Sequence, residues 1–184
     1  MRKGNEILKF IKRSINILSV FLVFAICLSG CGKNSELESY KTSMKTFFTE
    51  VSDCNDAMNS IDPNADDAPA QLLTYIDKLN ASFATMAALE VPSEFKAAEG
   101  LADEAADNMS KAALSYHEAY DGEFNAQAES TASQYYERAF VRVQYIVSIL
   151  HGEIPEGEGV TVTTQEAGQI DPVEEGTTEQ QQQQ

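Results

Sequence analysis

Apolar residues recur at steps of three and four from residue 35 to residue 152, which is the spacing of one face of an α-helix. Helix-breaking residues divide this stretch into four segments, so the pattern predicts four long helices. We expect them to run from Ser35 to Ile61, from Asp66 or Asp67 to about residue 89, from Val91-Pro92 to about Asp121, and from about Phe124 to His151.

Local signals support these ends. Asp66 or Asp67 is placed to cap the second helix through a side-chain oxygen. Gly122 and Gly152 follow the third and fourth helices, where glycine commonly ends a helix. Many positions of the apolar stripe of the third segment are alanine, so we expect this helix to approach its neighbours closely. The expected buried positions of the fourth helix are Ala128, Ala132, Tyr135, Ala139, Val143, Ile146 and Leu150.

Similar helix lengths and short connections favour antiparallel neighbours. The sequence therefore predicts an all-α fold over residues 35–152, an up-down-up-down four-helix bundle. Residues 153–184 differ, because they hold eight acidic and no basic residues and end in five glutamines. This composition predicts a disordered acidic, Gln-rich tail.

The first 30 residues have the layout of a secretion signal. Residues 1–16 carry five basic residues against one acidic residue, and an apolar run of 12 residues follows from Ile17 to Leu28, interrupted only by Ser19. This run is shorter than the roughly 20 residues that a membrane-spanning helix needs.

The four residues Leu28-Ser29-Gly30-Cys31 resemble the lipobox of bacterial lipoproteins. The resemblance implies a diacylglyceryl group on the Cys31 thiol and signal cleavage between Gly30 and Cys31, with residues 31–34 left as a linker. Two or more acyl chains make a stable membrane anchor. We therefore expect the mature protein on the outer face of the cytoplasmic membrane, at the surface of a Gram-positive cell. The helical part also resembles small bacterial lipoproteins of unassigned role.

Removal of the signal would take away five of 13 basic and one of 29 acidic residues, leaving 8 and 28 and a formal net charge of −20. Such a surface repels nucleic acid. The acidic tip expected at the 62–67 and 121–124 connections would favour a basic partner or divalent cations. Cys54 would be the only remaining free thiol, and its place in the apolar pattern predicts a small buried side chain.

The loop between the first two helices offers weak candidates for a metal site. Asp62, Asn64 and Asp66 alternate as at the start of an EF-hand calcium loop. The sixth position is Asp67 instead of glycine, however, and the twelfth is Leu73 instead of glutamate. A turn with helix-capping aspartates is the favoured interpretation, and no metal is predicted.

The sequence does not favour a haem site or a di-metal site. Met44 and His151 are not expected to bind a haem together, because about 13 Å along the bundle would separate them. Leu114 and Ser148 stand where a di-metal site with a Glu-x-x-His motif needs glutamate. His117 is expected to be a partly exposed surface histidine. No cofactor is predicted.

These patterns predict a non-enzymatic helical binding or accessory module of the cell envelope. The membrane is one expected partner, through lipid on Cys31, and an envelope protein is a candidate for a second partner. The alternative is a carrier of a ligand, metal or haem, with its site inside the bundle or at the acidic distal loops. A buried polar cavity of several hundred Å³ would favour the carrier.

Overall fold

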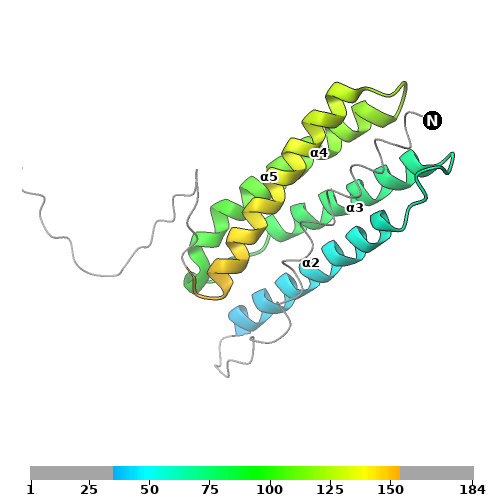
Figure 1. Ribbon diagram of the computed structural model, residues 1–184. Helices are drawn as coiled ribbons and strands as arrows, with labels where there is room; N and C mark the ends of the chain where they lie inside the picture. Colours follow the sequence, from blue (N-terminus) through cyan, green and yellow to red (C-terminus); the bar gives the residue numbers. More distant parts are fainter. Residues whose placement is uncertain (1–34, 154–184) are drawn as a thin grey trace, which may run out of the picture.

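The computed structural model describes residues 35–153, which form helices joined by loops and turns, with no strand in that range (Figure 1). The all-α prediction is confirmed. The predicted signal, the linker with Cys31, and all of the predicted tail except Glu153 lie outside the described residues. The elements are α2 (Ser35–Asn59), α3 (Ala68–Ala87), the short 3₁₀-helix η2 (Ser93–Ala98), α4 (Glu99–Tyr120) and α5 (Ala126–Leu150).

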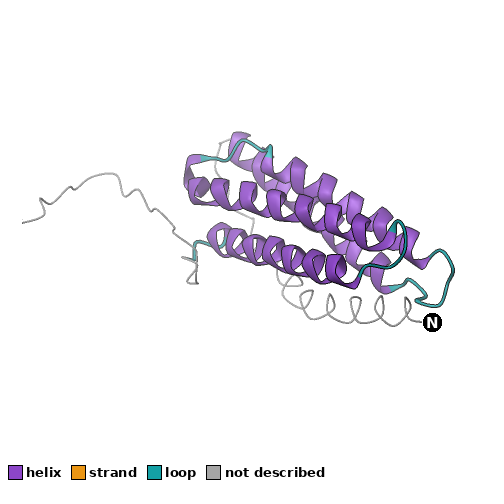
Figure 2. Cartoon of the chain, turned by 90° about the horizontal axis from the view of Figure 1, so that it is seen from above, coloured by secondary structure: helices purple, strands orange, loops and turns teal. Residues whose placement is uncertain are grey.

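The long helices lie side by side, and each runs back along the one before it (Figure 1). Side-chain contacts follow the same antiparallel order: Arg142 of α5 reaches Glu104 of α4, whereas Ser133 contacts Tyr116, further along α4. The loops gather at the two ends of the bundle (Figure 2). Within residues 35–153, none of the helices is both long enough and apolar enough to cross a membrane.

A series of aromatic rings connects the helices through the centre of the bundle. Phe47 of α2 meets Phe83 of α3 with ring centres 5.2 Å apart, and Phe83 meets Phe140 of α5 at 5.5 Å. Phe140 lies 4.6 Å from Tyr136, which meets Tyr116 of α4 at 6.5 Å. Aromatic pairs contribute about 0.5–1.5 kcal/mol each beyond the burial of their area, so these contacts help to fix the rotation of each helix.

The bundle is packed unevenly. The most extensive contact is between α4 and α5, whereas α2 packs mainly on α3. Alanines make the close approach of α4 and α5 possible, as the sequence predicts, because they leave room for the neighbouring backbone. The buried alanines of these two helices include Ala105, Ala112, Ala119, Ala128, Ala132 and Ala139.

The single third helix expected from Pro92 to Asp121 is wrong in its first part. The chain forms η2 before α4 begins at Glu99, because Phe95 adopts non-helical angles (φ −119°, ψ 19°). The Phe95 ring lies 5.9 Å from Tyr40 of α2. The kink thus coincides with an aromatic side chain that packs against the first turns of α2.

Three other boundaries differ from the prediction. Helix α2 ends at Asn59, two residues before Ile61. Asp67 precedes α3, but its side chain makes no capping hydrogen bond and instead accepts one from the Gln71 side chain at 2.9 Å. Helix α5 begins at Ala126, because the Asn125 side chain accepts hydrogen bonds from the backbone N–H groups of Gln127 and Ala128.

The far end of α5 matches the predicted glycine stop. Gly152 has a φ of 77°, and its N–H donates to the Ile149 carbonyl at 2.9 Å, while the N–H of Glu153 donates to the Ser148 carbonyl at 2.8 Å. This pair of bonds is a Schellman motif, which requires the left-handed conformation that glycine adopts without strain.

The assignment of Tyr135 to the core is wrong by one position. Tyr136 is the buried ring, whereas Tyr135 is only partly buried. The helical period allows either tyrosine to lie next to the apolar stripe, and the contacts with Phe140 and Tyr116 decide between them.

Candidate functional site

The residues of the predicted lipidation site, Gly30 and Cys31, lie outside the described residues. Helix α2 begins at Ser35, so only residues 32–34 separate Cys31 from the bundle. An extended chain covers at most about 3.3–3.6 Å per residue. A lipid on Cys31 would therefore hold the start of α2 within about 15 Å of the membrane surface.

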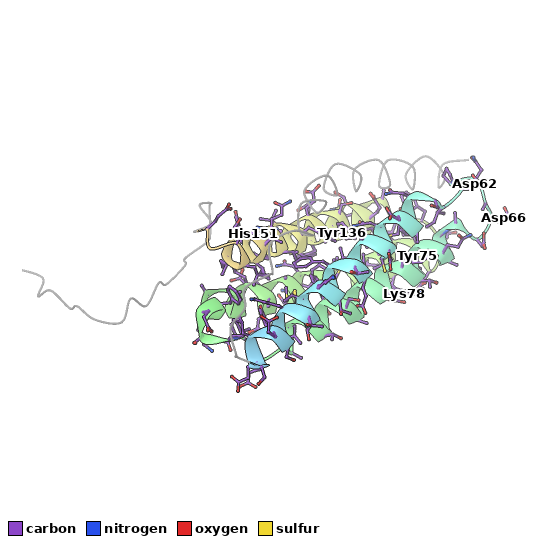
Figure 3. The ribbon with its side chains drawn as sticks, turned by 90° about the horizontal axis from the view of Figure 1, so that it is seen from below. Asp62, Asp66, Tyr75, Lys78, Tyr136 and His151 are labelled. Atoms are coloured by element: carbon purple, nitrogen blue, oxygen red, sulfur yellow. The ribbon has the colours of Figure 1, made fainter. Side chains whose placement is uncertain are left out.

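The loop between α2 and α3, which contains Asp62, Asn64 and Asp66, forms a turn. The backbone N–H and the side-chain amide of Asn64 both donate to Asp62 Oδ1, at 2.9 and 3.2 Å. This Asx turn uses the carboxylate oxygen that the calcium hypothesis would direct at an ion. Asp62 and Asp66 stand at one end of the bundle and His151 at the other (Figure 3). Residues 35–153 contain no group of three or more His, Cys, Asp or Glu side chains arranged to hold a metal.

His117 bridges two helices. Its Nε2 lies 3.0 Å from Asp77 Oδ1 of α3, and its Nδ1 lies 2.9 Å from Asp121 Oδ2. Ionised carboxylates only accept hydrogen bonds, so the imidazolium form, in which both ring nitrogens donate, satisfies both contacts. The hydrogen bond with Asp77, followed by the one with Asp121, raises the pKa of His117. The ring is 37% exposed, in line with the predicted surface position, and Asp77 is the partner that the sequence did not reveal.

A surface groove lies between the outer sides of α2 and α3, and we name it the α2–α3 groove. Its middle stretch has a volume of about 510 Å³ and includes Glu50, Asp53 and Cys54 of α2 and Tyr75, Lys78, Ala81, Ser82 and Thr85 of α3. A narrower stretch of about 150 Å³ shares Glu50, Ser82 and Thr85 with it. A third stretch of about 540 Å³ continues from Ser43 and Leu89 to Ser35 and Ser93.

Small side chains leave this groove open. Phe47 and Phe83 pack edge to face on the inner side of the α2–α3 contact. On the outer side, Ser43 and Thr46 of α2 face Thr85 of α3, and these side chains are too short to fill the space. Small polar residues beside the apolar stripes of both helices are a sequence signal for such a groove, although periodicity alone does not show that the two faces meet.

The middle stretch is acidic. Among its lining residues, Glu50 and Asp53 face one cation, Lys78, whose ammonium group lies 4.9 Å from the centre of the Tyr75 ring. Tyr75 and Lys78 lie together on α3 (Figure 3). Ser82, only 9% exposed, donates a hydrogen bond to Glu50 Oε2 at 2.6 Å. The serine thereby holds a carboxylate at the edge of the groove.

Cys54 forms part of the groove floor. Its side chain is buried, as predicted, and 7% exposed. Burial raises the pKa of the Cys54 thiol, Lys78 opposes this shift, and Asp53 and Glu50 add to it. The thiol is therefore mainly protonated at neutral pH and is a weak nucleophile.

No protein-family profile, curated protein or solved structure matches this chain.

Proposed function

We propose that this protein is a non-enzymatic binding module of the cell envelope, anchored through lipid on Cys31 to the outer face of the cytoplasmic membrane. The observation that carries the proposal is the start of α2 at Ser35, four residues after Cys31. The α2–α3 groove opens at this same end, because Ser35 and Glu36 form part of its third stretch. The anchor would therefore present the groove beside the membrane.

Binding at the surface is better supported than carriage inside the bundle. The positions between the helices are filled by large side chains with almost no exposed area, including Tyr116, Phe83, Phe140, Met44 and Met109. The open volume that supports binding lies instead on the outer side of α2 and α3. Met44 belongs to the packed core, and His151 is exposed at the end of α5.

The anchor is tested by Cys31→Ala in cells supplied with a palmitate analogue. We expect the variant to lose the label and to leave the membrane fraction, whereas a Cys54→Ala control keeps both properties. Protease added to intact cells should degrade the wild-type bundle if it faces outward. A Cys31→Ala protein that remains in the membrane would mean that the apolar run at residues 17–28 is the anchor, which would contradict the proposal.

A further inference from the structure

The α2–α3 groove is long enough to hold a helical segment. Its three stretches adjoin one another, and together they follow α2 from Cys54 back to Ser35. Nineteen helical steps of about 1.5 Å each correspond to about 28 Å. A helical segment of about 18–20 residues would fit along this length.

The floor and the edges of the groove differ in polarity. Tyr75 in the middle stretch and Leu89 and Val91 in the third stretch are partly buried and contribute apolar surface to the groove. Glu50 and Asp53 contribute carboxylates in the middle stretch, and Glu36 and Glu90 do so in the third. An occupant that matches this surface is apolar on one face and basic along its sides.

We propose that the α2–α3 groove binds a basic amphipathic helix of an envelope protein. This inference rests on the proposed function as a surface-exposed binding module and names the chemistry of its partner. Helices with apolar faces commonly bind in grooves between two helices. Charge complementarity carries the choice of partner, because the groove lining named above has four carboxylates against Lys78.

Glu50 is held in place at the edge of the groove by Ser82. The hydrogen bond from Ser82 Oγ to Glu50 Oε2, 2.6 Å long, fixes one carboxylate oxygen. The other oxygen, Oε1, can accept a hydrogen bond from a lysine or arginine. A fixed carboxylate loses less side-chain freedom on binding than a mobile one. The net charge of −20 expected for the mature chain would also steer a basic segment toward the surface. A neutral glycan would use neither property.

The test uses the full lipidated protein in nanodiscs of zwitterionic lipid, with empty nanodiscs as the background. The probe is a fluorescent leucine–lysine peptide of about 18 residues that is amphipathic as a helix, and fluorescence anisotropy measures its affinity. We expect saturable binding that weakens as salt is added. A matched peptide with glutamate in place of lysine should not bind.

Two pairs of variants locate the site. Glu50→Gln with Asp53→Asn should weaken binding at least about tenfold, whereas Asp103→Asn with Glu123→Gln makes the same charge change at exposed positions outside the groove and should have little effect. Ala81→Trp places a large ring in the middle stretch, and Ala84→Trp places one on an exposed position of α3 outside it. Only Ala81→Trp should reduce affinity, and thermal unfolding should show that both variants remain folded.

Several outcomes would overturn the proposal: absence of peptide binding, equal losses in the groove and control variants, or binding of soluble peptidoglycan fragments in place of the basic peptide. Failure of the proposed anchor is distinguishable from these outcomes. Loss of lipid in Cys31→Ala changes the membrane fraction and leaves the peptide affinity of the detergent-purified protein unchanged, whereas the groove variants change the affinity and leave anchoring intact.

Discussion

The hydroxyl of Tyr136 in α5 donates a hydrogen bond of 3.2 Å to Asn55 Oδ1 in α2, and the two side chains are only 2% and 3% exposed. The residues are 81 positions apart in sequence. Helices α2 and α5 are the first and last helices of the described bundle in chain order, so this bond connects the first helix to the last one inside the core. A buried amide without its partner is costly, which makes the pair a determinant of how the bundle closes.

Removal of the Tyr136 hydroxyl should therefore destabilise the fold. Tyr136→Phe is expected to lower the free energy of unfolding by about 1–3 kcal/mol, measured by urea denaturation. Tyr135→Phe, at the neighbouring and partly buried ring, should change it by much less. Combining Tyr136→Phe with Asn55→Leu should recover part of the loss, because no buried amide then remains unpaired. Equal effects of Tyr135→Phe and Tyr136→Phe would contradict the role of this bond.

The His117 bridge should make stability depend on pH. Because Asp77 and Asp121 raise the pKa of His117 above its ordinary value of 6.5 in the folded state, the stabilisation is complete below about pH 6.5 and is lost as pH rises through the higher folded pKa. The ring is 37% exposed, so solvent screening limits the effect to less than about 1 kcal/mol.

His117→Gln should remove this part of the pH dependence, measured as the difference in unfolding free energy between about pH 6 and pH 9. His151→Gln, at the exposed end of α5, is the control and should retain it. A His117→Gln protein with the wild-type pH profile over this range would show that the bridge does not contribute.

Two glycines should respond to alanine with opposite signs. Gly152→Ala places a side chain at a φ of 77° and should destabilise the protein by about 1–2 kcal/mol. Gly100 is the second residue of α4, and an added Cβ there meets no atom within 4 Å. Gly100→Ala should stabilise by at most about 0.5–1 kcal/mol, since alanine loses less conformational freedom in a helix. Thermal unfolding of both variants measures the two effects, and a shift of the same sign in both would contradict the assignment.

The Cys54 thiol should react slowly in the folded protein. With Cys27→Ser and Cys31→Ser in place, maleimide labelling at pH 7 should be roughly an order of magnitude slower than in urea, because burial limits access and raises the thiol pKa. Lys78→Met should slow it further, because Lys78 lowers that pKa. Lys45→Met, outside the groove lining, should leave the rate unchanged, and a faster rate in Lys78→Met would contradict the assigned electrostatics.

Local patterns within the sequence determine much of this protein. The three-and-four spacing specifies which residues are helical, because a helix repeats every 3.6 residues whatever its neighbours are. The same spacing predicts burial of Cys54, Val143 and Ile146, and these side chains are buried. The left-handed conformation at Gly152 likewise depends on local sequence. The lipidation of Cys31 is also a prediction from local sequence, and it stays one.

Only the tertiary structure decides which faces meet. The choice of Tyr136 over Tyr135, the kink at Phe95, the Asp77–His117 bridge and the α2–α3 groove all depend on how the helices are rotated against one another. Periodicity defines a stripe about 100° wide or more and cannot select within it. That selection comes from ring contacts and hydrogen bonds between residues up to 81 positions apart, because their energies depend on side-chain placement to within an ångström.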